Sequence, residues 1–260
     1  MSNIPSHPYF FSPSLSNPNH PLFIFLPGMD ETGKDLISIQ TAGLETAFDV
    51  RCLIIPSDEF SSWDYLSEQV IAFTKSELGK TPRSVYLCAE SFGTCIALKA
   101  MLKAPKLFSR IILINSASSF HLVPWLNWGS YLFHLIPEFL YKSSSFMALS
   151  ALTSFNKLLP NAHDALLKTV KNAPKKAVIQ RLNLMRQFDI DEMKLHQFPQ
   201  PVLLIASEAD LILPSVEEAK RLAKILPNAQ VVTIPHKGHA CLVEEGVNLL
   251  KILKTTQQLS

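Results

Sequence analysis

Glycine is scarce in this sequence, with eight residues in 260, so a glycine at a turn indicates a specific local need. The four cysteines form no CxxC pair, and three of them lie in or beside apolar runs. This usage favours small buried residues in a reducing compartment over disulfides or a metal site. Neither charge sign dominates, since 24 basic residues face 22 acidic ones. We therefore expect no metal, no cofactor and no nucleic acid partner.

Long apolar runs are also absent. No stretch of about 18 apolar residues occurs, so no transmembrane helix is expected. The N-terminus lacks the basic region and apolar run of a secretory signal. The mean hydropathy is slightly positive, which suggests apolar ligands or a membrane surface. We expect a cytoplasmic protein with a possible peripheral membrane contact. The basic run from Lys168 to Gln187 is one candidate for it, although a solvated helix face is the simpler explanation.

Short apolar runs alternate with helical patterns along most of the chain. Six runs are continuously apolar, as in strands buried on both faces of a parallel sheet: Pro21–Gly28, Val50–Pro56, Ser84–Glu90, Arg110–Ala117, Pro201–Ser207 and Ala229–Pro235. Helical patterns cover Trp63–Leu78, Phe92–Leu102, Val216–Leu226 and Val243–Leu253. The alternation predicts an α/β fold with right-handed crossovers. The first 20 residues are rich in Pro, Ser and Asn and are expected to form an irregular lead-in.

One segment, residues 118–195, breaks this rhythm. It carries no strand signal, follows a helical pattern and is dense in large apolar side chains. Because it is too long for a plain loop, we interpret it as a helical cap inserted between two parts of one core, 1–117 and 196–260. Within it, the side chains expected to bind an apolar substrate are Phe120, Trp125, Trp128, Tyr131 and His134. Burial of the cap's own core is the alternative use of such aromatic residues.

The stretch "YLCAESFGTCIAL" places Ser91 between a predicted strand and a predicted helix. A nucleophile elbow needs this context, because a sharp strand-to-helix turn lifts the serine hydroxyl above the sheet edge. Small residues must flank such a serine so that strand and helix can approach closely. Gly93 supplies one of them, whereas Ala89 stands where the usual pattern has glycine. A polar residue at an ordinary strand–helix junction would look the same in this pentapeptide alone.

A serine nucleophile needs a base, and His239 is the best placed of the eight histidines. It lies in "HKGHACL", just after the last predicted strand, and so at the same sheet edge as Ser91. Gly238 suits a loop that turns a side chain into a cleft. His236, three residues earlier, is the rival. We favour His239 on this geometry.

The base in turn needs an acid to orient it. The stretch "SEADLILP" follows the penultimate predicted strand and offers Glu208 and Asp210. Asp210 lies farther past the strand end, where a loop carboxylate reaches the neighbouring loop, whereas Glu208 suits a solvated turn. The chain order is then Ser91, Asp210 and His239, the order that α/β-hydrolases use.

Acyl transfer also needs backbone amides that stabilise the oxyanion, each worth ~3 kcal/mol. One donor is expected to be the N–H of Phe92, directly after Ser91. The other is expected from Met29, in the loop after the first predicted strand, where Gly28 permits a tight turn.

With these elements together, the chain resembles the α/β-hydrolase superfamily from about Pro21 onward, on the stretches "FLPGMDETG", "CAESFGT", "SEADLILP" and "HKGHACL". It is most similar to the hydrolase-like domain of plant and cyanobacterial phytyl ester synthases and diacylglycerol acyltransferase-type proteins. Those pair an LPG-x-D-x-TG loop with a G-E-S-F-G-G elbow, and this chain has Ala89 and Thr94 for the first and last glycine. The longer members carry a second, glycerolipid-acyltransferase-like domain, and we expect this chain to hold the hydrolase-like domain alone.

The resemblance implies an α/β-hydrolase fold, a mostly parallel sheet flanked by helices, with an inserted cap. It also implies a serine enzyme that cleaves a carboxylic ester or thioester with an apolar acyl or isoprenoid-like group. An acyltransferase that resolves the same acyl-enzyme with an alcohol is the first alternative. A non-catalytic module that binds an apolar ligand is the second, because such folds can keep the pocket and lose the chemistry.

Overall fold

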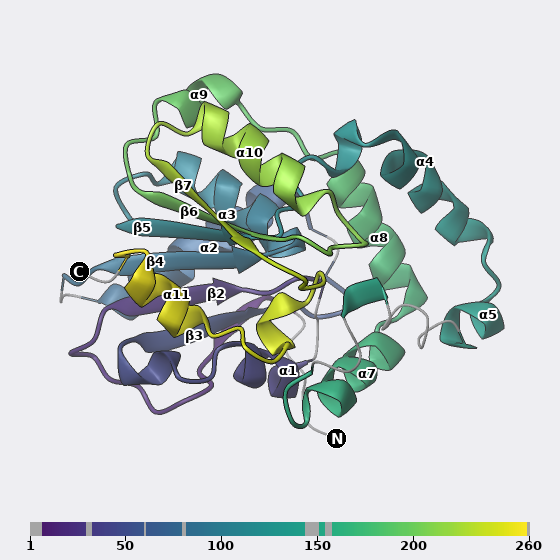
Figure 1. The fold of residues 1–260 in the computed structure, drawn as a ribbon, viewed down its shortest axis with the longest axis horizontal. Helices are drawn as coiled ribbons and strands as arrows, with labels where there is room; N and C mark the ends of the chain where they lie inside the picture. Colours follow the sequence, from purple (N-terminus) through teal and green to yellow (C-terminus); the bar gives the residue numbers. More distant parts are fainter. Residues whose placement is uncertain are drawn as a thin grey trace.

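The structure is a computed structural model that describes residues 7–29, 33–59, 61–79, 82–143, 151–153 and 158–258. Within these residues one sheet of seven strands runs through the centre of the molecule (Figure 1). The strands are β1 Tyr9–Phe11, β2 Leu22–Leu26, β3 Asp49–Ile54, β4 Val85–Glu90, β5 Arg110–Ile114, β6 Val202–Ser207 and β7 Ala229–Ile234. Their order is β1-β3-β2-β4-β5-β6-β7, and every neighbouring pair except β1–β3 is parallel. The six predicted strands and the α/β class are confirmed.

Two predictions about the strands need correction. The lead-in is not wholly irregular, because Tyr9–Phe11 pairs antiparallel with β3, Tyr9 opposite Ile54. Three residues are too short to show a period, so pairing with β3 and not local pattern defines this strand. The expectation of burial on both faces is wrong for β7, whose residues are exposed or half-buried. It lies at the edge of the sheet, where no described strand pairs with its other side.

Helices cover both faces of the sheet (Figure 1). They are α1 Lys34–Gln40, η1 Leu44–Thr46, α2 Trp63–Leu78, α3 Phe92–Lys103, α10 Ser215–Ile225, η5 Cys241–Val243 and α11 Leu249–Thr255. The alternation along β2 shows how the faces differ. Leu22, Ile24 and Leu26 pack in one buried cluster with α2 and α3. Phe23 and Phe25 pack in the other cluster, with α1 and α11.

The predicted boundaries of α2, α3 and α10 agree with the structure to within a residue. The predicted helix Val243–Leu253 is wrong at its start, since the chain forms η5 and only later α11. Between the two, Gly246 has a φ of 79°, which breaks helical backbone. Asn248 then caps α11, because its side-chain oxygen accepts the N–H of Lys251 at 2.8 Å.

The segment between β5 and β6 is mainly helical in its described parts, although Leu158 forms an isolated β-bridge with Glu244. Its helices are η2 Phe120–Leu122, α4 Pro124–Leu132, η3 Phe133–Leu135, α5 Glu138–Ser143, α7 Ala162–Asn172, α8 Lys175–Arg186 and α9 Glu192–His196. Figure 1 shows α4, α5, α7 and α8 grouped on one side of the molecule, whereas α9 lies with α10. The division into core and cap stays a prediction. Among the described helices, none combines the length and apolar character required to span a bilayer.

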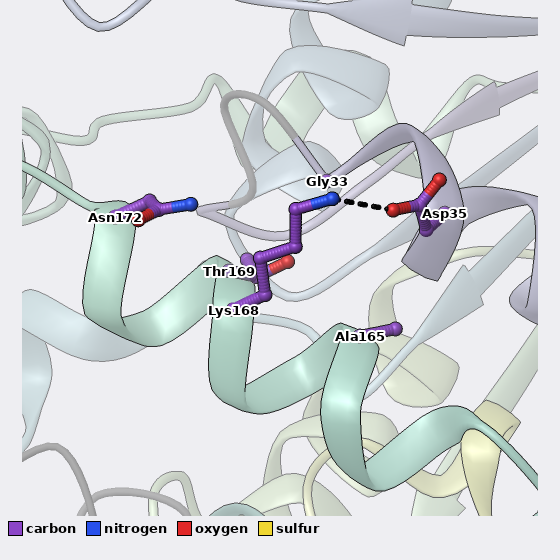
Figure 2. A pocket seen from close by; sticks show the side chains of 6 residues that line it. All are labelled: Gly33, Asp35, Ala165, Lys168, Thr169 and Asn172. Atoms are coloured by element: carbon purple, nitrogen blue, oxygen red, sulfur yellow. Dashed lines mark hydrogen bonds and ion pairs between the residues drawn. The ribbon is translucent and has the colours of Figure 1, made fainter.

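A small cavity lies between α1 and α7 (Figure 2). Its volume is about 150 Å³, and Gly33, Asp35, Ala165, Lys168, Thr169 and Asn172 line it. The Lys168 ammonium and the Asp35 carboxylate form an exposed ion pair of 2.8 Å at its edge. Pockets for drug-sized ligands measure roughly 300–1,000 Å³, so this cavity is too small to hold a long apolar substrate.

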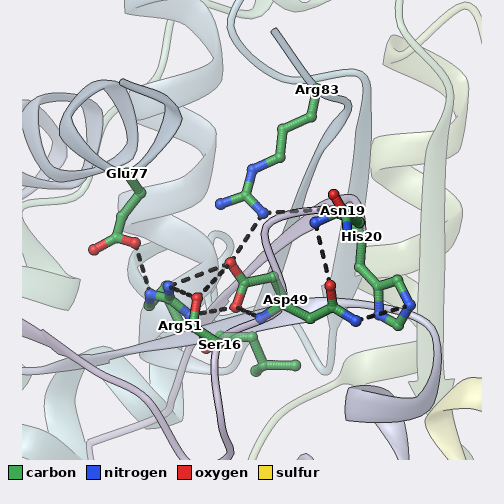
Figure 3. A network of polar contacts seen from close by, with 9 residues as sticks. Ser16, Asn19, His20, Asp49, Arg51, Glu77 and Arg83 are labelled. Atoms are coloured by element: carbon green, nitrogen blue, oxygen red, sulfur yellow. Dashed lines mark hydrogen bonds and ion pairs between the residues drawn. The ribbon is translucent and has the colours of Figure 1, made fainter. Parts of the chain in front are cut away.

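A buried carboxylate, Asp49 at the start of β3, anchors the lead-in to the sheet (Figure 3). Arg51 and Arg83 donate to its two oxygens at 2.7 and 2.9 Å. Ser16 and the backbone N–H of Asn17 donate to it at 3.2 Å. Burial alone would raise the pKa of the Asp49 carboxyl, but the bonds from Arg51 and Arg83 outweigh it and lower this pKa.

Candidate active site

Ser91 alone makes the turn between β4, which ends at Glu90, and α3, which begins at Phe92. Its backbone has φ 50° and ψ −118°, a region that residues with a Cβ rarely adopt. Hydrogen bonds hold it from both sides. Its N–H donates to the carbonyl of Ile114 at 2.9 Å, and its own carbonyl accepts from the Thr94 hydroxyl at 2.5 Å. The turn is thus a strained elbow fixed by β5 and by the first turn of α3.

Gly93 is required by the close approach of α3 to the end of β2. A Cβ at this position would lie 2.4 Å from the carbonyl oxygen of Leu26 and 2.6 Å from that of Pro27. Both neighbours are backbone atoms, which cannot move aside as a flexible side chain can. Gly28 lies on the same side, where a Cβ would be 3.5 Å from the Cβ of Ser91. The loop after β2 therefore packs directly against the elbow.

The structure brings Ser91, Asp210 and His239 together in one hydrogen-bonded row. The Nε2 atom of His239 lies 2.8 Å from the Oγ atom of Ser91. Its Nδ1 atom lies 2.7 Å from the Oδ2 atom of Asp210. All three side chains are buried or nearly so. With an ionised Asp210, Nδ1 carries the proton and Nε2 is left to accept from the serine hydroxyl, which is the tautomer that a general base needs.

Asp210 is held in its charged form by more than His239. Its Oδ1 atom accepts the backbone N–H groups of Ile212 and Leu213 at 2.8 and 3.0 Å, and its Oδ2 atom accepts the Ser215 hydroxyl at 2.5 Å. Burial opposes ionisation, but the hydrogen bond and charge of His239, with Ser215 and Leu213, outweigh it and lower the pKa of Asp210. The carboxylate is therefore both charged and fixed in direction.

The two rival residues lie elsewhere. His236 and Glu208 are both exposed, and the backbone N–H of His236 donates to the Glu208 carboxylate at 3.4 Å. They form the outer edge of the loops whose inner side carries His239 and Asp210. His239 lies three residues after His236, and Asp210 lies two residues after Glu208. This difference in position puts His239 and Asp210 in the candidate site and leaves His236 and Glu208 exposed.

Two supporting residues are not evident from the sequence. Asn115, fully buried after β5, donates from Nδ2 to the carbonyl of His239 at 2.7 Å. Glu244, fully buried after η5, accepts the N–H of Gly238 through Oε1 at 2.9 Å. Both side chains hydrogen-bond to the backbone of the loop that carries His239. The one available signal for Asn115 is a polar residue directly after an apolar strand.

The predicted oxyanion donors are Phe92, which directly follows Ser91, and Met29, which follows Gly28 in the loop after β2. Phe92 is the first residue of α3, where a backbone N–H has no partner within the helix. Its ring packs on Trp63, with ring centroids 4.7 Å apart, which fixes the start of the helix. Met29 follows Gly28 in the loop that packs on Ser91 and is itself half-buried against the core. Their role as donors stays a prediction.

The five predicted substrate-binding residues do not share one environment. Phe120 is buried, whereas Trp125, Trp128, Tyr131 and His134 are exposed. Their role in binding substrate stays a prediction. The cavity in Figure 2 contains none of the three residues of the hydrogen-bonded row. Within the described parts of the chain, no group of three or more His, Cys, Asp or Glu side chains is placed to hold a metal ion.

Comparisons with known proteins agree with the fold. The family model described as alpha/beta hydrolase fold matches residues 51–246. Phytyl ester synthase 1, chloroplastic, of Arabidopsis thaliana is 31% identical over 277 residues, which cover 96% of this chain and 39% of that protein. The chain thus spans about two fifths of the length of this relative.

Two further matches are more distant. The pimeloyl-[acyl-carrier protein] methyl ester esterase of Nitrosomonas europaea is 25% identical over 190 residues, which cover 69% of this chain and 74% of that protein. The structure of MenH from S. aureus has a TM-score of 0.73 at 17% identity and covers 97% of this chain and 99% of that one. This likeness shows the shared fold.

Proposed function

Because the chain belongs to the alpha/beta hydrolase family, we propose that it is a serine hydrolase that cleaves a carboxylic ester or thioester. The observation that carries this proposal is the row in which His239 bonds to Ser91 at 2.8 Å and to Asp210 at 2.7 Å. The strained elbow adds to it, because a backbone held in a costly conformation at a candidate nucleophile is typical of functional sites.

In the proposed mechanism, His239 takes the proton from the Ser91 hydroxyl as its oxygen attacks the substrate carbonyl. Asp210 holds the imidazole by its Nδ1–H and stabilises the imidazolium that forms. The N–H groups of Phe92 and Met29 stabilise the oxyanion, each by ~3 kcal/mol. The leaving alcohol or thiol takes the proton from His239, and an acyl-enzyme remains. Water, deprotonated by His239, then releases the acid and restores Ser91.

We propose an apolar acyl or isoprenoid-like group in the substrate. Two observations support this choice. The chain is 31% identical to a protein named phytyl ester synthase, and the segment after β5 holds no Asp, Glu, Lys or Arg from position 115 to 137.

Acyl transfer is the second candidate function, and the name of the Arabidopsis relative favours it. The same acyl-enzyme would then be resolved by an alcohol in place of water. Incubation with an activated ester and either phytol or glycerol separates the two functions, because only transfer yields a new ester detectable by mass spectrometry.

A fluorophosphonate probe tests the serine chemistry. The proposal expects one covalent adduct, which mass spectrometry locates on Ser91. Ser91→Ala should abolish labelling, whereas Ser119→Ala, at another buried serine, should leave it intact. No labelling of the folded wild type would instead favour a module that binds an apolar ligand without turning it over.

The length of the acyl group is tested with p-nitrophenyl esters from acetyl to palmitoyl. The proposal expects kcat/KM to rise with chain length at first, because each buried methylene adds about 0.8 kcal/mol. A steady fall from acetyl onward would show that the site does not accept a long apolar group.

A further inference from the structure

The outer side of α4 carries an apolar stripe that the protein core does not use. Trp125, Trp128 and Leu132 are exposed on this helix, and Leu135 continues the row just beyond it. Trp128 is 75% exposed and Leu135 is 76% exposed. The spacing of three or four residues puts them on one face of the helix. Leu126 is buried on the other face and supplies the packing that holds the helix in place.

This stripe is a concentrated patch and not scattered exposure. Eleven large apolar side chains are exposed in the described parts of the chain, and seven of them fall between residues 122 and 140. They are Leu122, Trp125, Trp128, Tyr131, Leu132, Leu135 and Leu140, here called the α4 face. No charged side chain interrupts the sequence from position 111 to 137. An exposed apolar patch of this kind on a protein surface marks an interaction site.

Basic side chains border the α4 face. The Arg186 guanidinium lies 3.7 Å from the centre of the Tyr131 ring and also donates to the Ser130 hydroxyl at 3.0 Å. The Lys175 ammonium donates to the carbonyl of Ile136 at 2.5 Å. Lys171 and Lys176 are exposed on either side of Lys175. Within residues 122–140 the one acidic residue is Glu138, whereas the side chains of Arg186 and Lys175 both contact this segment.

We propose that the α4 face docks on an anionic phospholipid membrane. Tryptophan and tyrosine prefer the headgroup level of a bilayer, leucine favours the acyl boundary below it, and lysine and arginine pair with phosphates. The α4 face offers these residue types in that arrangement. A second copy of this chain fits less well, because a symmetric contact through the α4 face would bring the bordering basic side chains of two copies together.

The α4 face is connected to the candidate active site through the loop after β5. The loop that leaves β5 leads directly into η2 and α4. In this loop, the Ser116 hydroxyl donates to the Thr94 hydroxyl at 3.0 Å, and Thr94 in turn bonds to the carbonyl of Ser91. The elbow and the α4 face are therefore joined by a short, buried connection. The docking proposal itself rests on the surface and not on the serine chemistry.

Vesicle co-sedimentation tests the proposal with the whole protein. Vesicles of phosphatidylcholine with phosphatidylglycerol should bind it, and vesicles of phosphatidylcholine alone should bind it much less. High salt should weaken the binding. Tryptophan emission should shift to shorter wavelength on binding, because Trp125 and Trp128 would leave water while Trp63 is already buried. Trp125→Phe with Trp128→Phe should remove this shift.

Matched variants distinguish binding through the α4 face from non-specific binding to vesicles. Leu132→Ser with Leu135→Ser should weaken vesicle binding about tenfold or more, since two leucines lose their apolar burial. Lys171→Glu with Lys176→Glu should weaken binding to anionic vesicles to a similar degree. Lys251→Glu with Lys254→Glu, an equal charge change on α11, should have little effect. Leu15→Ser, at another exposed leucine, should also bind as the wild type does.

Three results would overturn the proposal. The first is that the wild-type protein does not bind anionic vesicles. The second is that the variants at the α4 face and those on α11 bind these vesicles equally well. The third result is a dimer that forms without lipid and that Leu132→Ser with Leu135→Ser dissociates. It would show that the α4 face binds a second copy of the chain and not a membrane. Circular dichroism must show that each variant is folded. Ser91→Ala should bind vesicles like the wild type, so failure of the proposed chemistry and failure of docking are distinguishable.

Discussion

The side-chain amide of Asn115 donates a hydrogen bond of 2.7 Å to the backbone carbonyl of His239. The same amide donates to the Ser207 hydroxyl at 3.0 Å, and its oxygen accepts the Ser207 N–H at 2.8 Å. One fully buried side chain thus ties the ends of β5 and β6 to the loop that carries the candidate base. Asn115 is a positioning residue in the proposed mechanism, because it fixes His239 without touching the substrate.

Asn115→Gly should lower kcat about tenfold, the equivalent of one or two hydrogen bonds. KM should change less, since the variant alters the orientation of the His239 imidazole and not the binding of the acyl group. Glycine is the right replacement because Asn115 has φ 47°, which glycine adopts without strain. Steady-state kinetics with a p-nitrophenyl ester measure the effect.

Asn161→Gly is the matched control for this change. Asn161 also has a positive φ, of 64°, but it is exposed at the start of α7. Its replacement should leave kcat within a factor of about two, because no group of the candidate site is involved. If Asn115→Gly lowered the melting temperature with kcat unchanged, Asn115 would support the fold alone.

The elbow predicts different effects on activity for substitutions at its two small residues, Gly93 and Ala89. Gly93→Ala would place a methyl group 2.4 Å from the carbonyl oxygen of Leu26, so α3 must move away from β2. We expect it to cost about 1–3 kcal/mol of stability and most of the activity, because Ser91 and Phe92 move with the helix. Urea unfolding and kcat/KM with a short ester measure the two effects.

Ala89→Gly restores the glycine of the usual elbow pattern and serves as the comparison. Ala89 is fully buried in β4, where its methyl group packs in the core. Losing that methyl group and adding backbone freedom should cost about 1–2 kcal/mol of stability, with activity retained within a few-fold. Higher activity than the wild type would instead mean that the alanine holds the elbow too open.

The parallel strands and the three candidate site residues can be predicted from the sequence, whereas the short strand β1 cannot. Continuously apolar runs predict the six parallel strands, since β2 to β6 are buried on both faces along nearly their whole length and the edge strand β7 carries such a run as well. Ser91, Asp210 and His239 could be proposed together because the carboxyl ends of parallel strands meet at one sheet edge. The strand β1 could not, since three residues show no period and its partner β3 lies about forty positions away.

Asn115 and the α4 face show what a linear pattern omits. The amide of Asn115 has its role only because two other strand ends converge on it. For α4, the sequence indicates apolar side chains at helical spacing but not which face of the helix meets the core. The packed face carries the buried Leu126 and the buried Ser130, whereas both tryptophans lie outside.

Acid should reveal the network around Asp49. Its pKa is lowered in the folded protein, so its charge stabilises the fold above the unfolded-state pKa of about 3.9. That stabilisation is lost only as the pH falls through the lower, folded-state pKa. Asp49→Asn should therefore cost about 3 kcal/mol at neutral pH, and its deficit relative to the wild type should shrink below about pH 4.

Urea unfolding across this pH range measures the prediction for Asp49. Because every other carboxylate titrates in both proteins, the difference between them isolates Asp49. Asp189→Asn, at an exposed aspartate, should give a small difference at every pH. A deficit for Asp49→Asn that stays constant into acid would show that the carboxylate charge does not stabilise the lead-in.

The strain at Ser91 should be measurable as stability. Its φ of 50° and ψ of −118° cost a residue with a Cβ about 1–3 kcal/mol, whereas glycine is largely spared that cost. Ser91→Gly and Ser91→Ala both remove the hydroxyl and its bond to His239, so they differ in the backbone strain and in the backbone entropy lost on folding. We expect Ser91→Gly to be the more stable by about 1 kcal/mol, after its larger loss of backbone entropy is counted.

The same pair of substitutions at Ser38 should give the opposite order. Ser38 lies within α1 and is half-buried, and within a helix glycine is less stable than alanine by about 1 kcal/mol. Urea unfolding of the four variants compares the two sites directly. A reversed order at position 91 means that the fold sustains an unfavourable backbone in order to present the hydroxyl to His239. The same order at both sites would mean that Ser91 sits in an ordinary turn, and the elbow would lose its main support as a functional site.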